Sequence, residues 1–176
     1  MMDTEICLPR NLAAVAIILM AFVTSAHAKV IEASDTHYRL SHSATTTISP
    51  DVLWERLVHP EQWWNPDHSY SGKAEHLSLD PQAGGLWRED WDGGSVAHGT
   101  VVQIIKGKVL RLEAPFGPLQ GMGAYVIWTI KIEPSGSGST VTFDEVAMAP
   151  PGSSLEAVAP AVDGVKGEAM RRLVGN

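Results

Sequence analysis

A succession of short extended segments separated by turn sequences occupies the middle of the chain and constrains its fold more than any other feature. The breaks are the sequences DPQAGG, DGG, KGK, APFGPLQGMG and EPSGSGS, whose residues favour tight turns. The segments around them predict strands over residues 70–79, 85–92, 96–105, 108–114, 123–133 and 139–147. Because five consecutive connections are short, the strands are expected to pair as an antiparallel meander.

One further strand and two short helices are expected before this meander. Residues 37–48 alternate between two faces and end in a run of threonines, which favours extended backbone. Ser49 and Pro50 then suit the first positions of a helix, which Pro60 ends. A second short helix is expected to begin at this proline and to carry the next two tryptophans.

The C-terminal segment predicts an amphipathic helix. Apolar residues recur every three or four positions from Leu155 to Leu173, and Ser153 with Glu156 matches a capping box. Pro160 is expected to kink this helix, or else the continuous helix begins only near that proline. A seven-stranded sheet has one face to cover, and this helix is the only large element able to cover it. We therefore expect an α+β fold in which a curved antiparallel sheet wraps around the C-terminal helix and leaves a cavity between them.

The N-terminus predicts a secretory signal peptide over residues 1–28. Twelve apolar residues run from Leu12 to Val23, and the small residues Ala26 and Ala28 form a cleavage site. This run is shorter than the roughly 20 residues that span a bilayer, and an uncleaved anchor is the alternative interpretation. Cleavage after Ala28 leaves residues 29–176 as a single domain, periplasmic or secreted, with no stable membrane insertion.

The composition of the mature chain argues against several classes of function. Cys7 precedes the apolar run, so no cysteine remains for disulfides or thiolate chemistry. The mature chain carries 12 basic and 18 acidic residues, a net charge of −6, and no basic cluster beyond Arg171 and Arg172. This balance argues against nucleic acid as a partner. Without a serine-nucleophile elbow, a phosphate-binding glycine loop or close-spaced metal ligands, no cofactor or metal site is expected.

The candidate site centres on the strand expected at 85–92. The period-two alternation of a strand places Trp87, Glu89 and Trp91 on one face. A carboxylate there is costly to bury without a partner, and His98 on the next strand is expected to lie across from Glu89 or near it. This pair could perform acid–base chemistry or hold two strands together, and the tryptophans could line a pocket or fill the core.

Other candidates lie near the open end of the expected sheet and on its inner face. The further expected ligand-binding residues are Trp54, Trp64, His68, Tyr70, Trp128 and Phe143. Glu145 is expected on the same inner face as one more polar candidate. Several indoles that converge with few polar groups are typical of a small-molecule site.

The order of these elements resembles the START-like, or SRPBCC, superfamily with its helix-grip fold. The resemblance rests on TTTISPDVLWERLVHPEQWW, DPQAGGLWRED, HGTVVQIIKGKVLRL, SGSGSTVTF and VDGVKGEAMRRL. It is nearest to the polyketide cyclase/dehydrase-like and heat-shock-ATPase-activator-like branch. Counterparts of WWNPDHSYSG and RLEAPFGPLQGMG make the chain similar to an exported subgroup of that branch. The resemblance implies a cavity for an apolar or aromatic small molecule, but it does not imply one chemistry.

Two function classes remain open from the sequence. The first is an exported protein that holds an apolar or aromatic ligand between the sheet and the C-terminal helix. The second is an enzyme of the cyclase/dehydratase type that uses Glu89 and His98 on a bound polyketide-like or aromatic substrate. A partner-binding module, which the activator-like relatives suggest, is disfavoured by export away from cytosolic chaperones.

Overall fold

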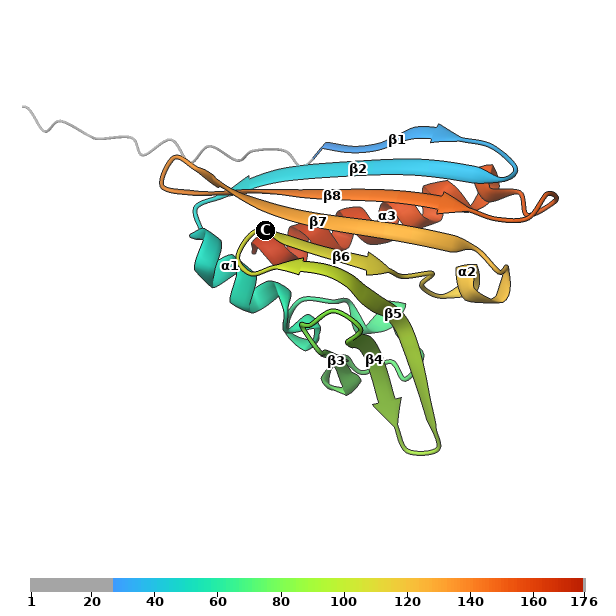
Figure 1. The fold of residues 1–176 in the computed structure, drawn as a ribbon, viewed down its shortest axis with the longest axis horizontal. Coiled ribbons are helices and arrows are strands. Elements are labelled where there is room, and N and C mark those ends of the chain that lie inside the picture. Colours follow the sequence, from blue (N-terminus) through green and yellow to red (C-terminus); the bar gives the residue numbers. More distant parts are fainter. Residues whose placement is uncertain (1–26, 176) are drawn as a thin grey trace, which may run out of the picture.

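A single antiparallel sheet of eight strands forms the body of the molecule in a computed structural model, which describes residues 27–175 (Figure 1). The strands are β1 (His27–Ala33), β2 (His37–Thr46), β3 (Leu77–Leu79), β4 (Leu86–Trp91), β5 (Gly94–Ile105), β6 (Val109–Glu113), β7 (Tyr125–Ser135) and β8 (Gly138–Met148). Their order in space is β1-β2-β8-β7-β6-β5-β4-β3. The predicted meander is confirmed from β3 to β8, and β2 joins it by pairing with β8.

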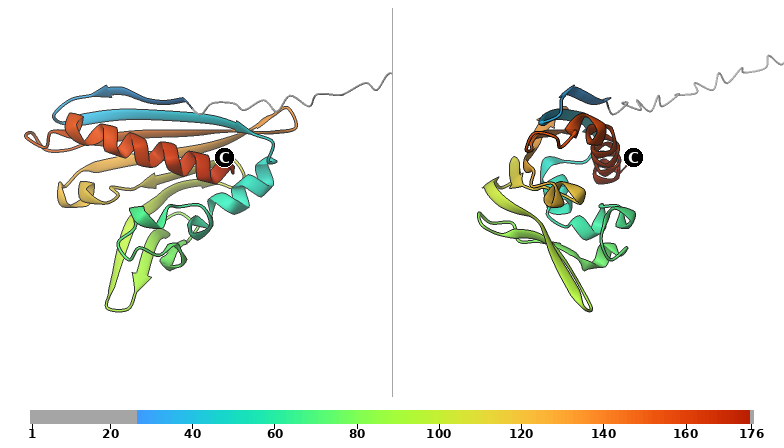
Figure 2. Two further views of the ribbon diagram at one scale, coloured as in Figure 1. Left: turned by 180° about the vertical axis from the view of Figure 1, so that it is seen from behind. Right: turned by 90° about the vertical axis from the view of Figure 1, so that its right-hand side faces the viewer.

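One long helix, α3 (Leu155–Val174), lies on the concave side of the curved sheet, as the end-on view shows (Figure 2). The other helical segments are α1 (Pro50–Leu57), α2 (Pro118–Gly121) and the single 3₁₀ turns η1 (Pro60–Gln62), η2 (Pro66–His68) and η3 (Ala74–His76). Two short helices, α1 and η1, directly follow β2, as predicted, but η1 ends at Gln62 and does not carry Trp63 and Trp64. The predicted α+β helix-grip fold is therefore confirmed.

The number of strands and the course of residues 70–79 differ from the expectation. The eighth strand is β1, which pairs with β2 at one edge of the sheet. Of the strand expected at 70–79, only β3 forms, because the backbone before it makes hydrogen bonds to a side chain and not to a neighbouring strand. The main-chain N–H groups of Tyr70 and Ser71 donate to the carboxylate of Glu89 at 3.0 and 2.6 Å. These N–H groups bind a side chain, and the strand pairing with β4 begins only at Leu77.

The β1–β2 loop caps the start of α3 in place of the predicted capping box, which does not form. The carboxylate of Asp35 accepts hydrogen bonds from the main-chain N–H groups of Gly152 and Ser154 at 2.7 and 2.8 Å. The hydroxyl of Ser153 donates instead to the carbonyl of Pro150. The first N–H groups of the helix, those of Leu155 and Glu156, which a local cap would otherwise bind, donate to the main-chain carbonyls of Asp35 and Ser34, both at 3.0 Å.

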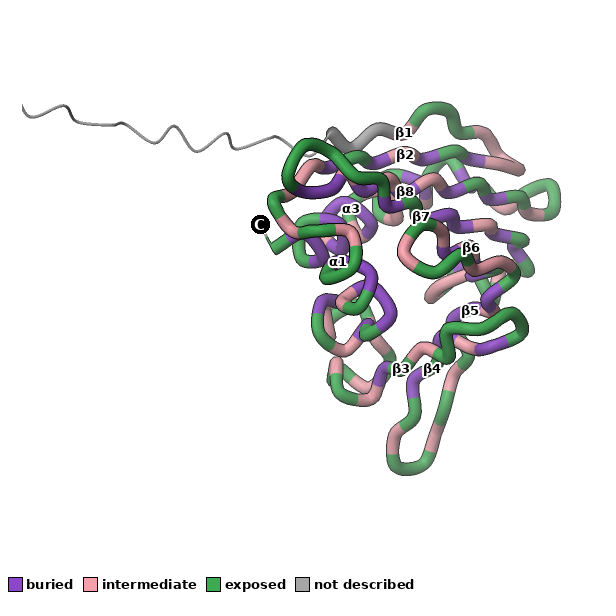
Figure 3. Tube along the Cα trace, turned by 60° about the vertical axis from the view of Figure 1, so that its left-hand side comes forward, coloured by how far each residue is buried: buried purple, intermediate pink, exposed green. Residues whose placement is uncertain are grey.

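The core lies between the inner face of the sheet and α3. Buried and exposed residues alternate along β7 and β8 (Figure 3). The residues of these strands that alternate onto the inner face are all buried: Val126, Trp128, Ile130, Val141, Phe143 and Glu145. Helix α3 runs without a break through Pro160, and Leu155 and Ala159 before the proline are fully buried. The alternative in which the helix begins near Pro160 is therefore wrong.

The predicted signal peptide lies outside the described residues, apart from its last two, which begin β1. Within residues 27–175, no helix is both long and apolar enough to span a bilayer.

Candidate functional site

A cavity of about 400 Å³ lies between the sheet and α3, at the end where two loops approach the helix. The helix contributes Val158, Val162 and Val165 to one wall. Trp64 and Phe116, which come from the two loops, contribute aromatic faces and stack on each other with ring centroids 5.2 Å apart. Volumes of 300–1,000 Å³ with mainly apolar walls are typical of small-molecule sites.

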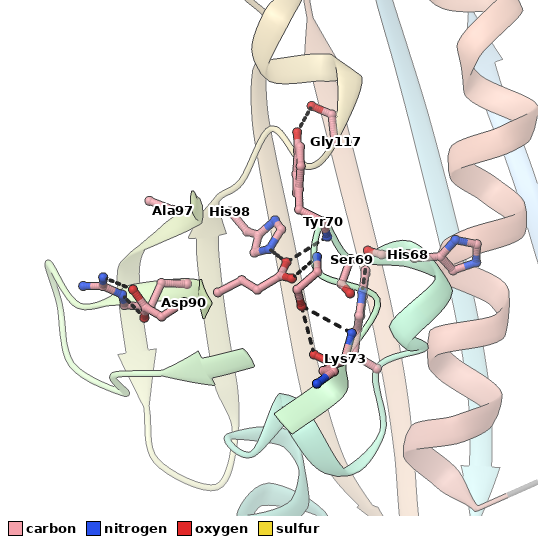
Figure 4. Close-up of polar contacts among 12 residues, drawn as sticks. His68, Ser69, Tyr70, Lys73, Asp90, Ala97, His98 and Gly117 are labelled. Atoms are coloured by element: carbon pink, nitrogen blue, oxygen red, sulfur yellow. Dashed lines mark hydrogen bonds and ion pairs between the residues drawn. The ribbon is translucent and has the colours of Figure 1, made fainter. Parts of the chain in front are cut away.

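Glu89 and His98 form a buried pair beside this cavity. The carboxylate of Glu89 is fully buried, and its Oε2 lies 3.0 Å from Nε2 of His98. The same carboxylate also accepts the two main-chain hydrogen bonds from Tyr70 and Ser71. Three donors thus hold the carboxylate, and through it the imidazole, in one orientation (Figure 4). A carboxylate–imidazole pair in this arrangement can support acid–base chemistry.

A β-bulge directs His98 toward the cavity. Trp87 pairs with Gly99 and Arg88 with Ala97, so His98 is an extra residue on β5 without a partner on β4. Bulges of this kind re-aim a side chain that regular alternation would place differently. Gly99 makes the bend possible, because a Cβ at this position would lie 2.6 Å from the Cβ of Ala114.

Burial and hydrogen bonding set the charges of the pair. Burial raises the pKa of Glu89, but the hydrogen bonds from Ser71, Tyr70 and His98 outweigh it and hold the pKa below its ordinary value. Burial lowers the pKa of His98 below its ordinary 6.5, although Glu89 opposes that change. At neutral pH the carboxylate is therefore charged and the imidazole is neutral. Nε2–H donates to Glu89, which leaves Nδ1 as an acceptor.

Stability is expected to fall as the pH drops from about 6.5 toward 5. Burial also lowers the pKa of His42, which lies between the sheet and α3 beside Asp163. Both imidazoles resist protonation in the folded chain, so the unfolded chain binds more protons below its ordinary pKa of 6.5. The carboxylate of Glu89, whose pKa is lowered, adds to this loss only near and below its ordinary pKa of 4.5.

Urea unfolding at about pH 7.5 and about pH 5.5 measures this effect. Substitution His98→Gln keeps an amide donor for Glu89 and removes the titration, so it should reduce the difference between the two pH values. An unfolding free energy that is equal at both pH values in the wild type would contradict the assignment of neutral imidazoles.

A second buried ionic group closes the inner end of the cavity. Nζ of Lys166 lies 2.8 Å from Oε2 of Glu145, and both side chains are 3% exposed. The two groups form a buried ion pair. Tyr38 donates to the other carboxylate oxygen at 2.7 Å. The ammonium also lies 3.3 Å from the ring centroid of Trp128, a cation–π contact.

Lys166 is a buried cation on α3, and two opposing effects act on its pKa. Burial lowers the pKa of Lys166, and Glu145 opposes this change. The chain of contacts from Tyr38 through Glu145 to Lys166 joins β2, β8 and α3. It therefore fixes the helix against the sheet at the end of the cavity.

The structure brings some of the predicted site residues to the cavity and places others behind it. Those that line it are Trp64, His68, Tyr70, His98 and Glu145. The predicted residues that are packed in the core and do not line it are Trp54, Trp87, Trp128 and Phe143. Trp87 has ring contacts with Trp64 and Phe116 and so supports the aromatic wall from behind. Glu89 acts on the cavity through His98.

Trp91 lies apart from this group. It is half-buried near the tip of the β4–β5 hairpin, where it pairs with Gly94, and it does not line the cavity. Its face follows the expected alternation, but the hairpin extends away from the region that α3 covers (Figure 1). The indole therefore covers Gly94, where an added Cβ would lie 2.5 Å from the ring.

Among the residues of the cavity wall that sequence reasoning missed are one aromatic and one charged residue. Phe116 lies in the predicted turn APFGPLQGMG, where an aromatic residue carries no periodic signal. Lys166 lies in the amphipathic helix four residues after Val162 and three before Ala169, and so on the apolar stripe. That position was a usable signal, because a charge within an apolar stripe needs a buried partner.

A metal centre finds no support in the part of the chain from residue 27 to 175. The described His, Asp and Glu side chains form no group of three that could hold a metal ion.

Comparison with known proteins supports the fold and leaves the chemistry open. No family model matches the sequence, and no curated protein matches it. A Rhodobacter sphaeroides protein matches the structure with a TM-score of 0.55 at 19% identity, covering 84% of this chain and 96% of its own. CalU16 from Micromonospora echinospora matches with a TM-score of 0.54 at 14% identity, covering 85% and 80%. At these identities the likeness shows the helix-grip fold alone.

Proposed function

We propose that this protein is an exported small-molecule-binding protein that holds an apolar or aromatic ligand in the cavity between the sheet and α3. The observation that carries the proposal is the cavity itself, which has a volume of about 400 Å³ and mainly apolar walls. The expected signal peptide supports export, and the helix-grip fold supports a cavity in this position. The few polar groups at the wall suit recognition of one or two ligand atoms.

The polar groups of the loops at the mouth are held by the protein itself. His68 lies 3.1 Å from Glu168 of α3, and the amide of Asn65 donates to the same carboxylate at 2.9 Å. Tyr70, which is exposed, donates weakly to the carbonyl of Gly117 at 3.5 Å across the opening. These contacts tie both loops to α3 or to each other and leave the apolar walls as the main binding surface.

An acid–base enzyme of the cyclase/dehydratase type is the second candidate function. One observation favours it: the Glu89–His98 pair is buried, held by three donors and placed at the cavity wall. A neutral imidazole backed by a carboxylate can accept a proton from a bound substrate. Carriage of a ligand needs only the apolar walls, whereas turnover also needs this pair.

Native mass spectrometry of the protein isolated from its own host tests the proposal. We expect a chain that begins at Lys29, in the envelope fraction, with a small apolar molecule bound. A chain that begins at Met1 or Met2 and carries no ligand would contradict both parts of the proposal. Turnover would be recognised by two bound masses that differ by one water, as for the substrate and product of a dehydration.

A further inference from the structure

We propose that the cavity selects an aromatic ligand that carries a hydroxyl group, and that this hydroxyl donates a hydrogen bond to Nδ1 of His98. The inference rests on the proposed function, since it assigns a chemical class to the ligand of the same cavity. It names a naphthol-like molecule, with a flat apolar body and one donor at its edge.

The position of His98 leaves one acceptor open to the ligand. Its Nε2 is engaged by Glu89, and its Nδ1 has no hydrogen-bond partner among the described residues. Nδ1 remains accessible, and because the imidazole ring lines the cavity, we infer that this atom faces it. The carboxylate of Glu89 is held in place by its three donors, one of which is His98. A flip of the imidazole ring that exchanged Nδ1 and Nε2 would break the hydrogen bond to this carboxylate and would therefore be costly.

The other buried polar side chains at the cavity are already matched within the protein. Glu145 accepts from Tyr38 and pairs with Lys166, and this group is electrically balanced. The indole N–H of Trp64 donates to the carbonyl of His68 at 3.0 Å. A ligand that offers a donor is therefore matched by His98, whereas Nζ of Lys166, which has no directed hydrogen-bond partner, is buried and not accessible to a ligand that offers only an acceptor.

Aromatic rings beside His98 define the shape of the ligand next to that acceptor. Phe116 stacks on the imidazole with a centroid distance of 5.1 Å and an angle of 13° between the planes. The ring of Tyr70 lies beside the imidazole, with a centroid distance of 5.9 Å and a tilt of 39° between the planes (Figure 4). A flat aromatic body can extend along these rings while its hydroxyl reaches Nδ1 in the ring plane.

The test compares naphthol with methoxynaphthalene, which has a similar shape but no donor, by displacement of the fluorescent probe phenylnaphthylamine. The wild-type protein is expected to bind naphthol about tenfold more tightly or better, because the ether leaves Nδ1 unpaired. His98→Phe keeps the stacked ring and removes the acceptor, so it should bring the two affinities together. His59→Phe is the matched control, because His59 is exposed and does not line the cavity, so this variant should retain the preference for naphthol.

The outcomes separate this inference from the proposed function. If the wild type binds the probe but binds naphthol and methoxynaphthalene equally, the inference is overturned and the proposed function stands. The inference is overturned in the same way if His59→Phe removes the preference as completely as His98→Phe does. If the wild type binds neither the probe nor the two ligands, the proposed function and the inference both fail.

Discussion

Replacing Lys166 by methionine is expected to lower the free energy of unfolding by about 3–5 kcal/mol, because it leaves the buried carboxylate of Glu145 without its cation. Lys166 and Glu145 are each 3% exposed and lie 2.8 Å apart, so water cannot replace the lost partner in the folded chain. Methionine has a similar shape, so the loss comes from the charge and not from a cavity. Urea or thermal unfolding measures it.

A double variant and a surface pair provide the controls for this prediction. Lys166→Met combined with Glu145→Gln removes both charges and keeps an acceptor for Tyr38, so it should recover most of the lost stability. Lys131 and Asp144 form an exposed pair on the same sheet at 3.5 Å. Lys131→Met should therefore change the stability by less than about 0.5 kcal/mol. Equal effects of the two single lysine variants would contradict the role assigned to Lys166.

The fold was predictable because its signals are local and repeated. Turn residues recur at every break of the meander, and the apolar stripe of the C-terminal helix continues for five turns. The start of α3 was not predictable in the same way. Asp35 caps this helix from more than a hundred residues away, and a local capping pattern in the sequence carries no information about such a contact.

The candidate site was predictable in part, for a reason that lies in the geometry of β4 and β5. Period-two alternation correctly placed Trp87 and Glu89 on the inner face, where both are fully buried. Alternation does not show how much of the strand α3 covers. It therefore could not show that Trp91 lies beyond the helix, apart from Trp87 and Glu89. The bulge that turns His98 inward depends on the register between two strands, which the spacing of residues does not reveal.

Filling the cavity is expected to abolish ligand binding without a matching loss of stability. Val162 lies at the cavity wall on α3 and is half-buried, so Val162→Trp adds an indole that can enter the cavity. A larger side chain in a packed core costs about 1–3 kcal/mol, whereas an existing void accommodates it. Val102→Trp is the matched control, because Val102 is 44% exposed and does not line the cavity.

Titration of the apolar probe phenylnaphthylamine against wild type, Val162→Trp and Val102→Trp, together with the unfolding free energy of each, tests the existence of a binding cavity most directly. The structure predicts that wild type and Val102→Trp bind the probe, and that Val162→Trp loses binding while its stability changes by less than about 1 kcal/mol. Unchanged probe binding in Val162→Trp, with a loss of about 1–3 kcal/mol in stability, would show a packed core in place of a binding cavity.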